Sequence, residues 1–274
     1  MDHNFILTKE NYHSPEARKH YMGASMFKEF EKCEVMGLAK VNGEIEEKKS
    51  DALTFGSYVD AYFSGELTEF IAEHPEMFKK DGTLLAKYNN IQEVIDSIEN
   101  CEDDNGEKIM MKYLNGEKQV IMTGEIAGVP WKIKMDAYHP NKLIVDQKIM
   151  KDMEDVWIDR DGFRVKVDFI EAYEYDVQGA SYQEIVRQNI DKQVPFVLAV
   201  TTKEEVPDNK LIKIDQEYLD LALDKIKAKA PRYWRIIQGL EEPKGCGHCP
   251  ACRARQKLNG VMSYKVMFKE KEEE

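Results

Sequence analysis

The sequence predicts an α/β (α+β) protein in which helices flank a central mixed β-sheet. Three observations support this prediction. Residues 131–138 alternate between apolar and polar side chains, with the period of two that is typical of a strand. Residues 195–201 are almost uniformly apolar, which predicts a further strand. Residues 167–189 repeat their apolar side chains with helical spacing. We expect all 274 residues to form a single domain, 1–274.

Residues 1 to about 115 are expected to form a helical part. Ser25 suits the N-cap of a helix that runs to about Lys40. A second helix is expected from Asp51 to Ser64, where Gly65 ends it. Further helices are expected at 84–99 and 108–114, and the strands begin after Gly116.

A β-hairpin is expected around a turn cluster at 139–141. If Tyr138 pairs with Lys142, then Asp136 lies opposite Ile144. Paired residues and residues two apart share a face of a sheet. One polar face then collects Asp136, Asp146 and Lys148, with Asp146 diagonal to Asp136. The opposite face would be filled by Trp131, Ile133, Met135, Leu143 and Val145.

Other strands and helices are expected on either side of this hairpin. A strand at 119–125 would join it through Ala127-Gly128; if Ile126 pairs with Val129, Gln119 and Glu125 point to the same polar face. The polar segment 151–166 is expected to border a substrate. The remaining expected elements are a helix at 167–189, strands at 195–201 and 211–214, a helix at 214–240 and a cysteine knuckle at about 244–256.

The polar face of the hairpin suggests a chemistry. Two carboxylates on one face repel each other unless a cation lies between them, and the hard oxygen ligands of Asp136 and Asp146 favour Mg²⁺ or Mn²⁺. Such an ion polarises a phosphoryl oxygen and lowers the pKa of a bound water. Lys148 would orient the nucleophile and offset charge that develops in the transition state. The pattern therefore predicts a metal-dependent phosphodiesterase; the alternative is an exposed hairpin with an ordinary ion pair.

A family resemblance rests on several motifs in order along the chain. They are SMFKEFEKCE at 25–34, FGSYVD at 55–60, Asp136…Asp146-x-Lys148, Gln178-x-x-x-Tyr182 and the late cysteines. On these motifs the chain resembles the PD-(D/E)xK nuclease superfamily, in its RecB-like branch, and within it the RecE-type exodeoxyribonucleases of phages and prophages. The resemblance spans nearly the whole chain and implies a restriction-endonuclease-like core.

The resemblance implies a role for each matching residue. Asp136 and Asp146 would be metal ligands, with the carbonyl of Gln147 as a third, and Lys148 would be the catalytic lysine. Gln178 and Tyr182 would form the helical motif that supports the site and touches the DNA backbone.

Two further acids are candidate metal ligands. RecB-like nucleases usually carry a His on the early helix as an extra ligand, and this chain has Asp60 there, which leaves the number and preference of metals open. Glu125 on the first strand is a weaker candidate. For Asp60 the alternative is a solvated acid on the polar face of its helix.

Four of the five cysteines suggest a second metal site. Cys246, Cys249 and Cys252 have a spacing that brings thiolates to one soft ion or cluster. His248 as the fourth ligand would suit Zn²⁺. Cys33 is the other candidate, because some RecB-like nucleases hold a [4Fe–4S] cluster with one early and three late cysteines. We expect iron–sulfur as the form of an occupied site, with an empty knuckle as the alternative. Cys101 is expected to be an ordinary side chain.

Composition limits the partners. The chain has 39 basic and 51 acidic residues, a formal net charge of −12, which argues against a protein that coats DNA non-specifically. A local basic groove for DNA could still include Lys132, Lys134 and Lys151. The sequence has no run of about twenty apolar residues, so no membrane span is expected. Without targeting features, the cytoplasm is the expected location.

These observations predict a Mg²⁺-dependent exodeoxyribonuclease that degrades one strand of linear duplex DNA ends for phage or prophage recombination. The resemblance implies a single-strand annealing protein as partner and a homo-oligomer. The alternative is a non-catalytic module that binds DNA ends or a partner and keeps the nuclease fold, which only Asp60 in place of His supports. A third interpretation is a structural zinc protein without nuclease activity.

Overall fold

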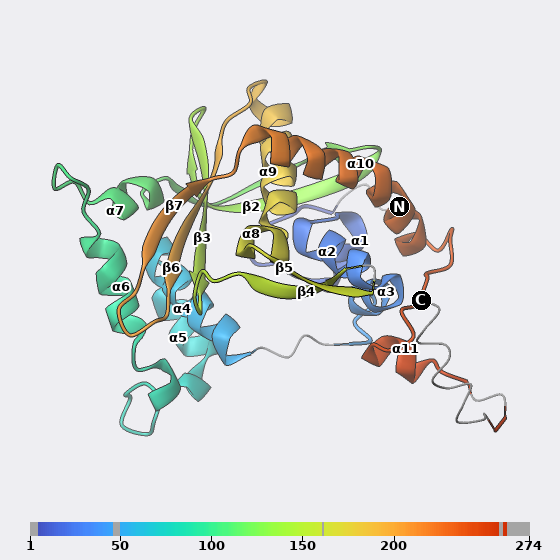
Figure 1. Cartoon of the computed structure of the whole chain (residues 1–274), viewed down its shortest axis with the longest axis horizontal. Helices are drawn as coiled ribbons and strands as arrows, with labels where there is room; N and C mark the ends of the chain where they lie inside the picture. Colours follow the sequence, from blue (N-terminus) through green and yellow to red (C-terminus); the bar gives the residue numbers. More distant parts are fainter. Residues whose placement is uncertain (1–4, 46–49, 161, 258–259, 262–274) are drawn as a thin grey trace.

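A computed structural model describes residues 5–45, 50–160, 162–257 and 260–261 of the chain (Figure 1). Helices precede the first strand of the main sheet in the described part. They are α1 (Pro15–His20), α2 (Ala24–Lys32), α3 (Glu34–Val41), α4 (Asp51–Ser64), α5 (Leu67–Glu73), α6 (Ile91–Asn100) and α7 (Ile109–Leu114), with 3-10 turns η1 (Pro75–Met77) and η2 (Ala86–Tyr88). No helix among the described residues is long and apolar enough to cross a membrane.

A five-stranded mixed sheet forms the centre of the molecule, as predicted. Its strand order is β1 (Glu117–Ile126), β2 (Val129–His139), β3 (Leu143–Met150), β6 (Phe196–Thr202) and β7 (Asn209–Lys213). β3 and β6 are parallel, and the other neighbours are antiparallel. Every residue of β6 is buried, which agrees with its apolar sequence. The central mixed sheet flanked by helices is therefore confirmed.

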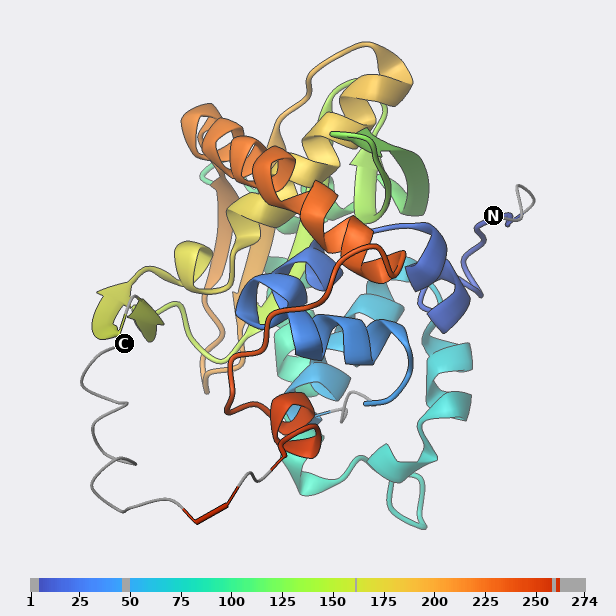
Figure 2. The same ribbon diagram turned by 90° about the vertical axis from the view of Figure 1, so that its right-hand side faces the viewer.

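Helices cover the sheet in two groups (Figures 1 and 2). α9 (Tyr175–Ile190), α10 (Gln216–Ile237) and α2 form the larger hydrophobic core with the sheet, around fully buried side chains such as Trp131 and Phe196. Helices α4, α6 and α7 form a second core with the sheet around Val145. Gly179 brings α9 close to the sheet, because a Cβ there would lie 2.7 Å from the ring of Phe196.

The hairpin between β2 and β3 has the predicted loop length, but the pairing is displaced. Tyr138 pairs with Ile144, and the predicted partner Lys142 lies in the turn, where Asn141 has a left-handed φ of 59°. The register differs from the predicted one by two residues. Because side chains alternate with a period of two, each residue of β3 still points to the predicted face of the sheet. Continued by one residue, the observed register places Asp136 opposite Asp146, whereas the prediction had them diagonal.

The prediction that five apolar side chains fill one common face of the hairpin is wrong. Trp131, Ile133 and Met135 belong to the larger core, and Val145 and Leu143 belong to the second core. The alternation changes between Met135 and Ala137, which lies in the second core. Gln119 is the residue facing this point on β1, and it has a left-handed φ of 52° that interrupts the regular strand. The predicted pair Ile126–Val129 is confirmed.

Three predicted helices are interrupted. The helix expected at 84–99 is replaced by the short turn η2 and by α6, which begins at Ile91. The helix expected from Ser25 to Lys40 begins at Ala24 and breaks at Cys33, whose φ of −170° is extended, so that α2 and α3 are separate. The helix expected at 167–189 is divided into α8 (Phe169–Ala172) and α9, with Glu174 in a left-handed conformation. The helix predicted at Asp51–Ser64 is confirmed as α4, with Ser50 as its N-cap and Gly65 at φ 82° as its C-cap.

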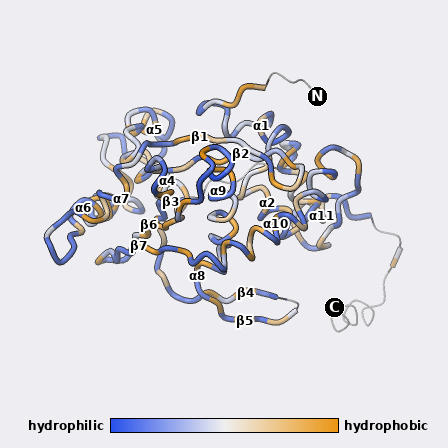
Figure 3. The backbone as a smooth tube through the Cα atoms, turned by 90° about the horizontal axis from the view of Figure 1, so that it is seen from above, coloured by the Kyte–Doolittle hydropathy of each residue, from blue (hydrophilic) through white to orange (hydrophobic). Residues whose placement is uncertain are grey.

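A second, two-stranded sheet was not predicted. β4 (Val156–Arg160) and β5 (Phe163–Val167) form a hairpin inside the segment expected only to border a substrate. It stands apart from the main sheet (Figure 3). Trp157 and Phe163 are large exposed side chains on it.

Candidate active site and cysteine cluster

A cavity of about 610 Å³ lies where β2, β3, α2, α4 and α9 meet. Three aspartates line it, one from α4 and one each from β2 and β3: Asp60, Asp136 and Asp146. Five cationic side chains also line it: Arg18, Lys28, Lys132, Lys134 and Lys148. The cavity therefore combines acids that could hold a cation with bases that could hold an anion.

Asp136, Asp146 and Lys148 converge in this cavity. Asp136 Oδ2 accepts a hydrogen bond of 2.8 Å from the backbone N–H of Gln147. Asp146, whose side chain is 2% exposed, forms an ion pair with Lys148 through Oδ2. The long apolar flanks of β2 and β3 fix these positions, because their side chains are buried in the two cores. The face predicted from the sequence thus exists around these three residues.

The electrostatics of the cavity favour a bound cation. Burial raises the pKa of Asp136 well above its ordinary value, and the neighbouring carboxylates of Asp146 and Asp60 raise it further. Burial also raises the pKa of Asp60. Burial disfavours the charged form of Lys148, but Asp146 and Asp136 outweigh it and raise the pKa of the ammonium. The ammonium of Lys148 alone thus does not offset the charge of the three carboxylates, whereas a divalent cation bound beside it would.

The donor set fits Mg²⁺ or Mn²⁺, since it consists of carboxylate oxygens. Asp136 and Asp146 would hold the ion, with Asp60 facing them from α4. These oxygens do not form a group within 4.8 Å of one another; among the described residues only four cysteines do so. Mg²⁺ usually keeps several waters, so a bound ion does not need all three aspartates as direct ligands.

Asp60 is held by a residue that sequence reasoning did not single out as a site residue. Gln119 Nε2 donates to both carboxylate oxygens of Asp60 at 3.4 Å, and Gln119 is only 3% exposed. Its left-handed backbone lies opposite Asp136 in the register. The contact orients Asp60 toward the other two acids, and the local strain at Gln119 fits a functional position.

The α9 motif supports the acids. Gln178 Nε2 donates to Asp146 Oδ1 at 2.6 Å. Tyr182 lies one turn further and donates its hydroxyl to the carbonyl of Lys134 at 2.9 Å, and burial raises the pKa of that hydroxyl. Both residues line the cavity, and both fix the geometry of β2 and β3; that they touch the DNA backbone stays a prediction. The hydroxyl of Tyr182 is committed to the backbone.

Two of the three predicted DNA-contacting lysines line the cavity. Lys132 and Lys134 approach the ring of Tyr12, with Nζ 4.5 and 5.5 Å from its centroid. Lys132 donates to the carbonyl of Tyr12, and burial lowers the pKa of Lys132 to about 8. Lys151 does not line the cavity; its side chain is 93% exposed and pairs with Asp152.

Lys28 is a cavity cation whose role was not predicted. Its Nζ donates to the carbonyl of Tyr173 at 2.8 Å and lies 5.4 Å from the ring centroid of Tyr175. Burial, with Lys148 second, lowers the pKa of Lys28 to about 8. Lys148 lies 5.3 Å from the same ring. In the sequence, Lys28 stands between the apolar residues Phe27 and Phe30, which are both buried in α2.

Glu125 is not brought to the site. It lies near the far end of the β1–β2 hairpin, where it pairs with Pro130, and its side chain is exposed. Its backbone N–H donates to Gln188 Oε1 at 3.0 Å. Gln147 does line the cavity; that its carbonyl binds a metal stays a prediction.

Comparison with known proteins places this geometry in a family. The family model for a PDDEXK-like domain of unknown function (DUF3799) matches residues 23–255, from the start of α2 to the end of α11 (Pro250–Ala254). The chain belongs to this family. Its fold is therefore PDDEXK-like, as the resemblance implied.

A solved structure is similar over nearly the full length of this DUF3799 chain. It is that of a protein from Eubacterium rectale described as a "putative exonuclease". The two chains are 41% identical, the TM-score is 0.86, and the similarity covers 96% of this chain and 98% of the other. No curated protein matches the chain.

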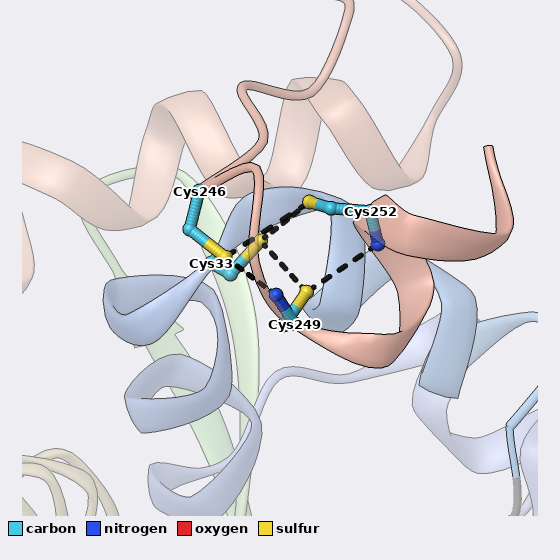
Figure 4. Close-up of side chains that lie close together, drawn as sticks. All are labelled: Cys33, Cys246, Cys249 and Cys252. Atoms are coloured by element: carbon cyan, nitrogen blue, oxygen red, sulfur yellow. Dashed lines mark hydrogen bonds between the residues drawn. The ribbon is translucent and has the colours of Figure 1, made fainter. Parts of the chain in front are cut away.

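The four-cysteine cluster of this DUF3799 chain could hold a metal. Cys33, from the joint between α2 and α3, meets Cys246, Cys249 and Cys252, and their Sγ atoms all lie within 4.8 Å of one another (Figure 4). Cys33 is therefore the fourth member, and His248 is not part of the group. Cys101 lies elsewhere, packed against the second core.

Under the nuclease function proposed below, replacing Gln178 by alanine is expected to lower the rate of Mg²⁺-dependent DNA digestion about 10- to 100-fold, the usual cost of losing a partner that orients a metal ligand. Since Gln178 acts through Asp146, the Mg²⁺ concentration for half-maximal rate should rise as well. The measurement is a Mg²⁺ titration of digestion. Gln188→Ala, on the same helix but bonded to Glu125, is the control. An unchanged Mg²⁺ requirement in Gln178→Ala would contradict this role.

Proposed function

We propose that the chain is a Mg²⁺- or Mn²⁺-dependent exodeoxyribonuclease that hydrolyses phosphodiester bonds on one strand of linear duplex DNA ends. The observation that supports it most is the convergence of Asp136, Asp146 and Lys148 in one cavity. The similarity to the Eubacterium rectale protein, described as a "putative exonuclease", supports the same reaction class.

The residues of the cavity would have different roles in hydrolysis. When bound between the aspartates, the metal would polarise the phosphoryl oxygen and lower the pKa of a water. Asp136 and Asp146 would hold this metal, and Gln178 keeps Asp146 in place through its hydrogen bond. In the metal-free protein the carboxylates of Asp146 and Asp136 raise the pKa of Lys148. Its ammonium would orient the attacking water and offset negative charge that develops on the phosphate.

The cationic side chains of the cavity would bind the DNA backbone. Lys28, Lys132, Lys134 and Arg18 face the same space as the acids. This local basic lining can attract phosphates although the whole chain carries a net charge of −12. Lys151, exposed outside the cavity, would contact DNA only at its periphery.

The biological setting proposed from the resemblance is phage or prophage recombination. There the strand left single by resection would bind a single-strand annealing protein, and the nuclease would act as a homo-oligomer. Co-purification with an annealing protein and the solution mass of the nuclease test these two partners.

The test of the activity compares DNA topologies. Linear duplex with one labelled strand should be shortened from its end in Mg²⁺, and covalently closed circular duplex of the same sequence should stay intact. EDTA should stop the reaction, and added Mg²⁺ should restore it. Digestion of the closed circle at the rate of the linear DNA would contradict the exonuclease assignment.

A second candidate is a non-catalytic module that binds DNA ends or a partner. The observation that favours it is Asp60 at the position where the resemblance expects His. This module would bind linear duplex in Mg²⁺ or Mn²⁺ without shortening it, so the same assay separates the two candidates.

A further inference from the structure

The cysteine cluster is the strongest feature that the hydrolytic site does not use. We propose that Cys33, Cys246, Cys249 and Cys252 bind a single structural Zn²⁺, in place of the iron–sulfur cluster expected from the sequence. This inference does not depend on the proposed nuclease activity, because none of the four cysteines lines the cavity.

The spacing of the sulfurs supports one ion. Sγ–Sγ distances are 3.6 Å for Cys33–Cys252, 3.7 Å for Cys33–Cys249 and 4.0 Å for Cys246–Cys252. Four thiolates about 2.3 Å from a tetrahedral Zn²⁺ are about 3.8 Å apart, the edge of that tetrahedron. In a [4Fe–4S] cluster each cysteine binds a different iron, so its sulfurs must be farther apart. The observed separations therefore match a single tetrahedral ion.

Backbone amides donate to two of the sulfurs in this cluster. The N–H of Cys249 donates to Cys246 Sγ at 3.3 Å, and the N–H of Cys252 donates to Cys249 Sγ at 3.5 Å. Such bonds stabilise the deprotonated sulfur, which is the form that binds metal. Binding of Zn²⁺ to four thiols forms four Zn–S bonds and releases four protons, with no change in oxidation state.

Contacts between protein groups bring the late cysteines to Cys33. The N–H of Val35 donates to the carbonyl of Lys244 at 3.3 Å, and the N–H of Lys244 donates to Glu34 Oε2 at 2.6 Å. Arg232 of α10 holds Glu34 with two bonds of 2.8 and 2.9 Å. Gly245 is required next to the cluster, because a Cβ there would lie 2.9 Å from Cys252 Sγ. The four sulfurs are thus held in place before a metal binds.

The chemistry of the site is structural. Four protein sulfurs complete the coordination of Zn²⁺ and leave no position for a substrate. The ion would join the end of α2, at Cys33, to the segment that carries α11, which lies beside α3 (Figure 2). Because α2 also places Lys28 in the cavity, the zinc fixes one wall of the proposed active site from outside.

The test is the metal content of the full-length protein, purified under anaerobic conditions with iron and zinc supplied to the host. We expect one zinc per chain, little iron and no absorbance near about 400 nm, the range of iron–sulfur centres. Four irons per chain with a brown colour would overturn the proposal in favour of a cluster. A protein without metal, with the cysteines reduced or in disulfides, would overturn it as well.

Variants identify the ligands. Cys33→Ser should lose its zinc and unfold at a lower temperature, whereas Cys101→Ser and His248→Ala should each keep one zinc per chain. Loss of zinc in His248→Ala, with full zinc in Cys33→Ser, would contradict the four-cysteine site. If Cys33→Ser does not fold, the absorption spectrum of Co²⁺ exchanged into the wild-type protein tests whether four thiolates bind the ion. Tetrahedral thiolate absorption is expected, and octahedral Co²⁺ absorption would contradict it.

Discussion

Replacing Lys148 by alanine is expected to lower the rate of duplex digestion about 10²–10³-fold at saturating DNA, the usual cost of losing one group that stabilises developing charge. Lys148 is the cation nearest to the acids, and its side chain is 21% exposed in the cavity. Asp146 keeps its hydrogen bond from Gln178 in the variant, so the site should stay folded. The measurement is single-turnover digestion of end-labelled duplex in Mg²⁺.

Lys142→Ala is the matched control for this variant. Lys142 lies exposed in the turn of the same hairpin, outside the cavity, and its loss should leave the rate within about twofold, as for most surface substitutions. DNA binding, measured with Ca²⁺ in place of Mg²⁺, should change much less than the rate in Lys148→Ala. A variant that binds poorly but cuts at the wild-type rate when saturated would contradict the catalytic role of Lys148.

Replacing Asp136 by asparagine is expected to act in opposite directions on activity and stability. Activity should fall about 10²-fold or more, because the side chain loses the charge that holds a divalent cation. The metal-free protein in EDTA should instead become more stable at neutral pH, with a Tm higher by a few degrees. The amide oxygen of the new side chain can still accept the hydrogen bond from the N–H of Gln147, so packing is kept.

The stability gain has a defined pH dependence. The pKa of Asp136 is raised in the folded protein by burial and by Asp146 and Asp60. Above about pH 3.9, the ordinary pKa of an Asp in an unfolded chain, the Asp136 carboxyl loses its proton in the unfolded state but keeps it in the folded state. The free energy of unfolding of the wild type therefore falls with rising pH until the pH passes the raised pKa of Asp136 in the folded protein. The advantage of Asp136→Asn should therefore be present at neutral pH and vanish in acid below the ordinary pKa.

Thermal unfolding in EDTA over a pH series measures this effect. Asp224→Asn, a surface aspartate of α10 with a 76% exposed side chain, is the control and should show no such gain. An Asp136→Asn protein less stable than wild type at neutral pH in EDTA would contradict the account of repelling acids.

The polar face of the hairpin could be predicted because it depends on local alternation alone. The loop lies at 140–142 instead of the predicted 139–141. This difference changes the partner of Tyr138 but leaves the side chains of β3 on the predicted faces. The predicted common apolar face does not exist, because the side chains of β2 change faces near Asp136. This change could not be predicted, because it occurs where Gln119, which has a left-handed backbone conformation, faces Asp136. The expected pairing of the first strand predicts Gln119 on the polar face, but its contact with Asp60 of α4 joins residues far apart in the chain and has no local signal.

The breaks at Cys33 and Glu174 depend on contacts far along the chain. Cys33 separates α2 from α3, where Val35 bonds to Lys244 of the C-terminal segment, so helix propensity is overridden by tertiary structure. Glu174 pairs with Lys225 of α10 at 2.8 Å. Such partners cannot be assigned from a single sequence without the fold.

The β4–β5 hairpin could have been predicted from a signal that was overlooked. The dipeptide Asp161-Gly162 lies between two stretches that alternate, which is a strong hairpin pattern. Trp157 and Phe163 are exposed on this hairpin, so burial in a core does not account for its apolar positions. The cationic lining of the cavity was predicted in part, through Lys132 and Lys134, and missed Lys28 on α2.

The most direct measurement of the central claim is an anomalous difference map of crystals grown with Mn²⁺. The account predicts a peak between the carboxylates of Asp136 and Asp146, at Mn²⁺–oxygen ligand distance from both, with Lys148 beside it. A map with full density for these side chains and no peak between them, or with Mn²⁺ bound only elsewhere, would contradict the account.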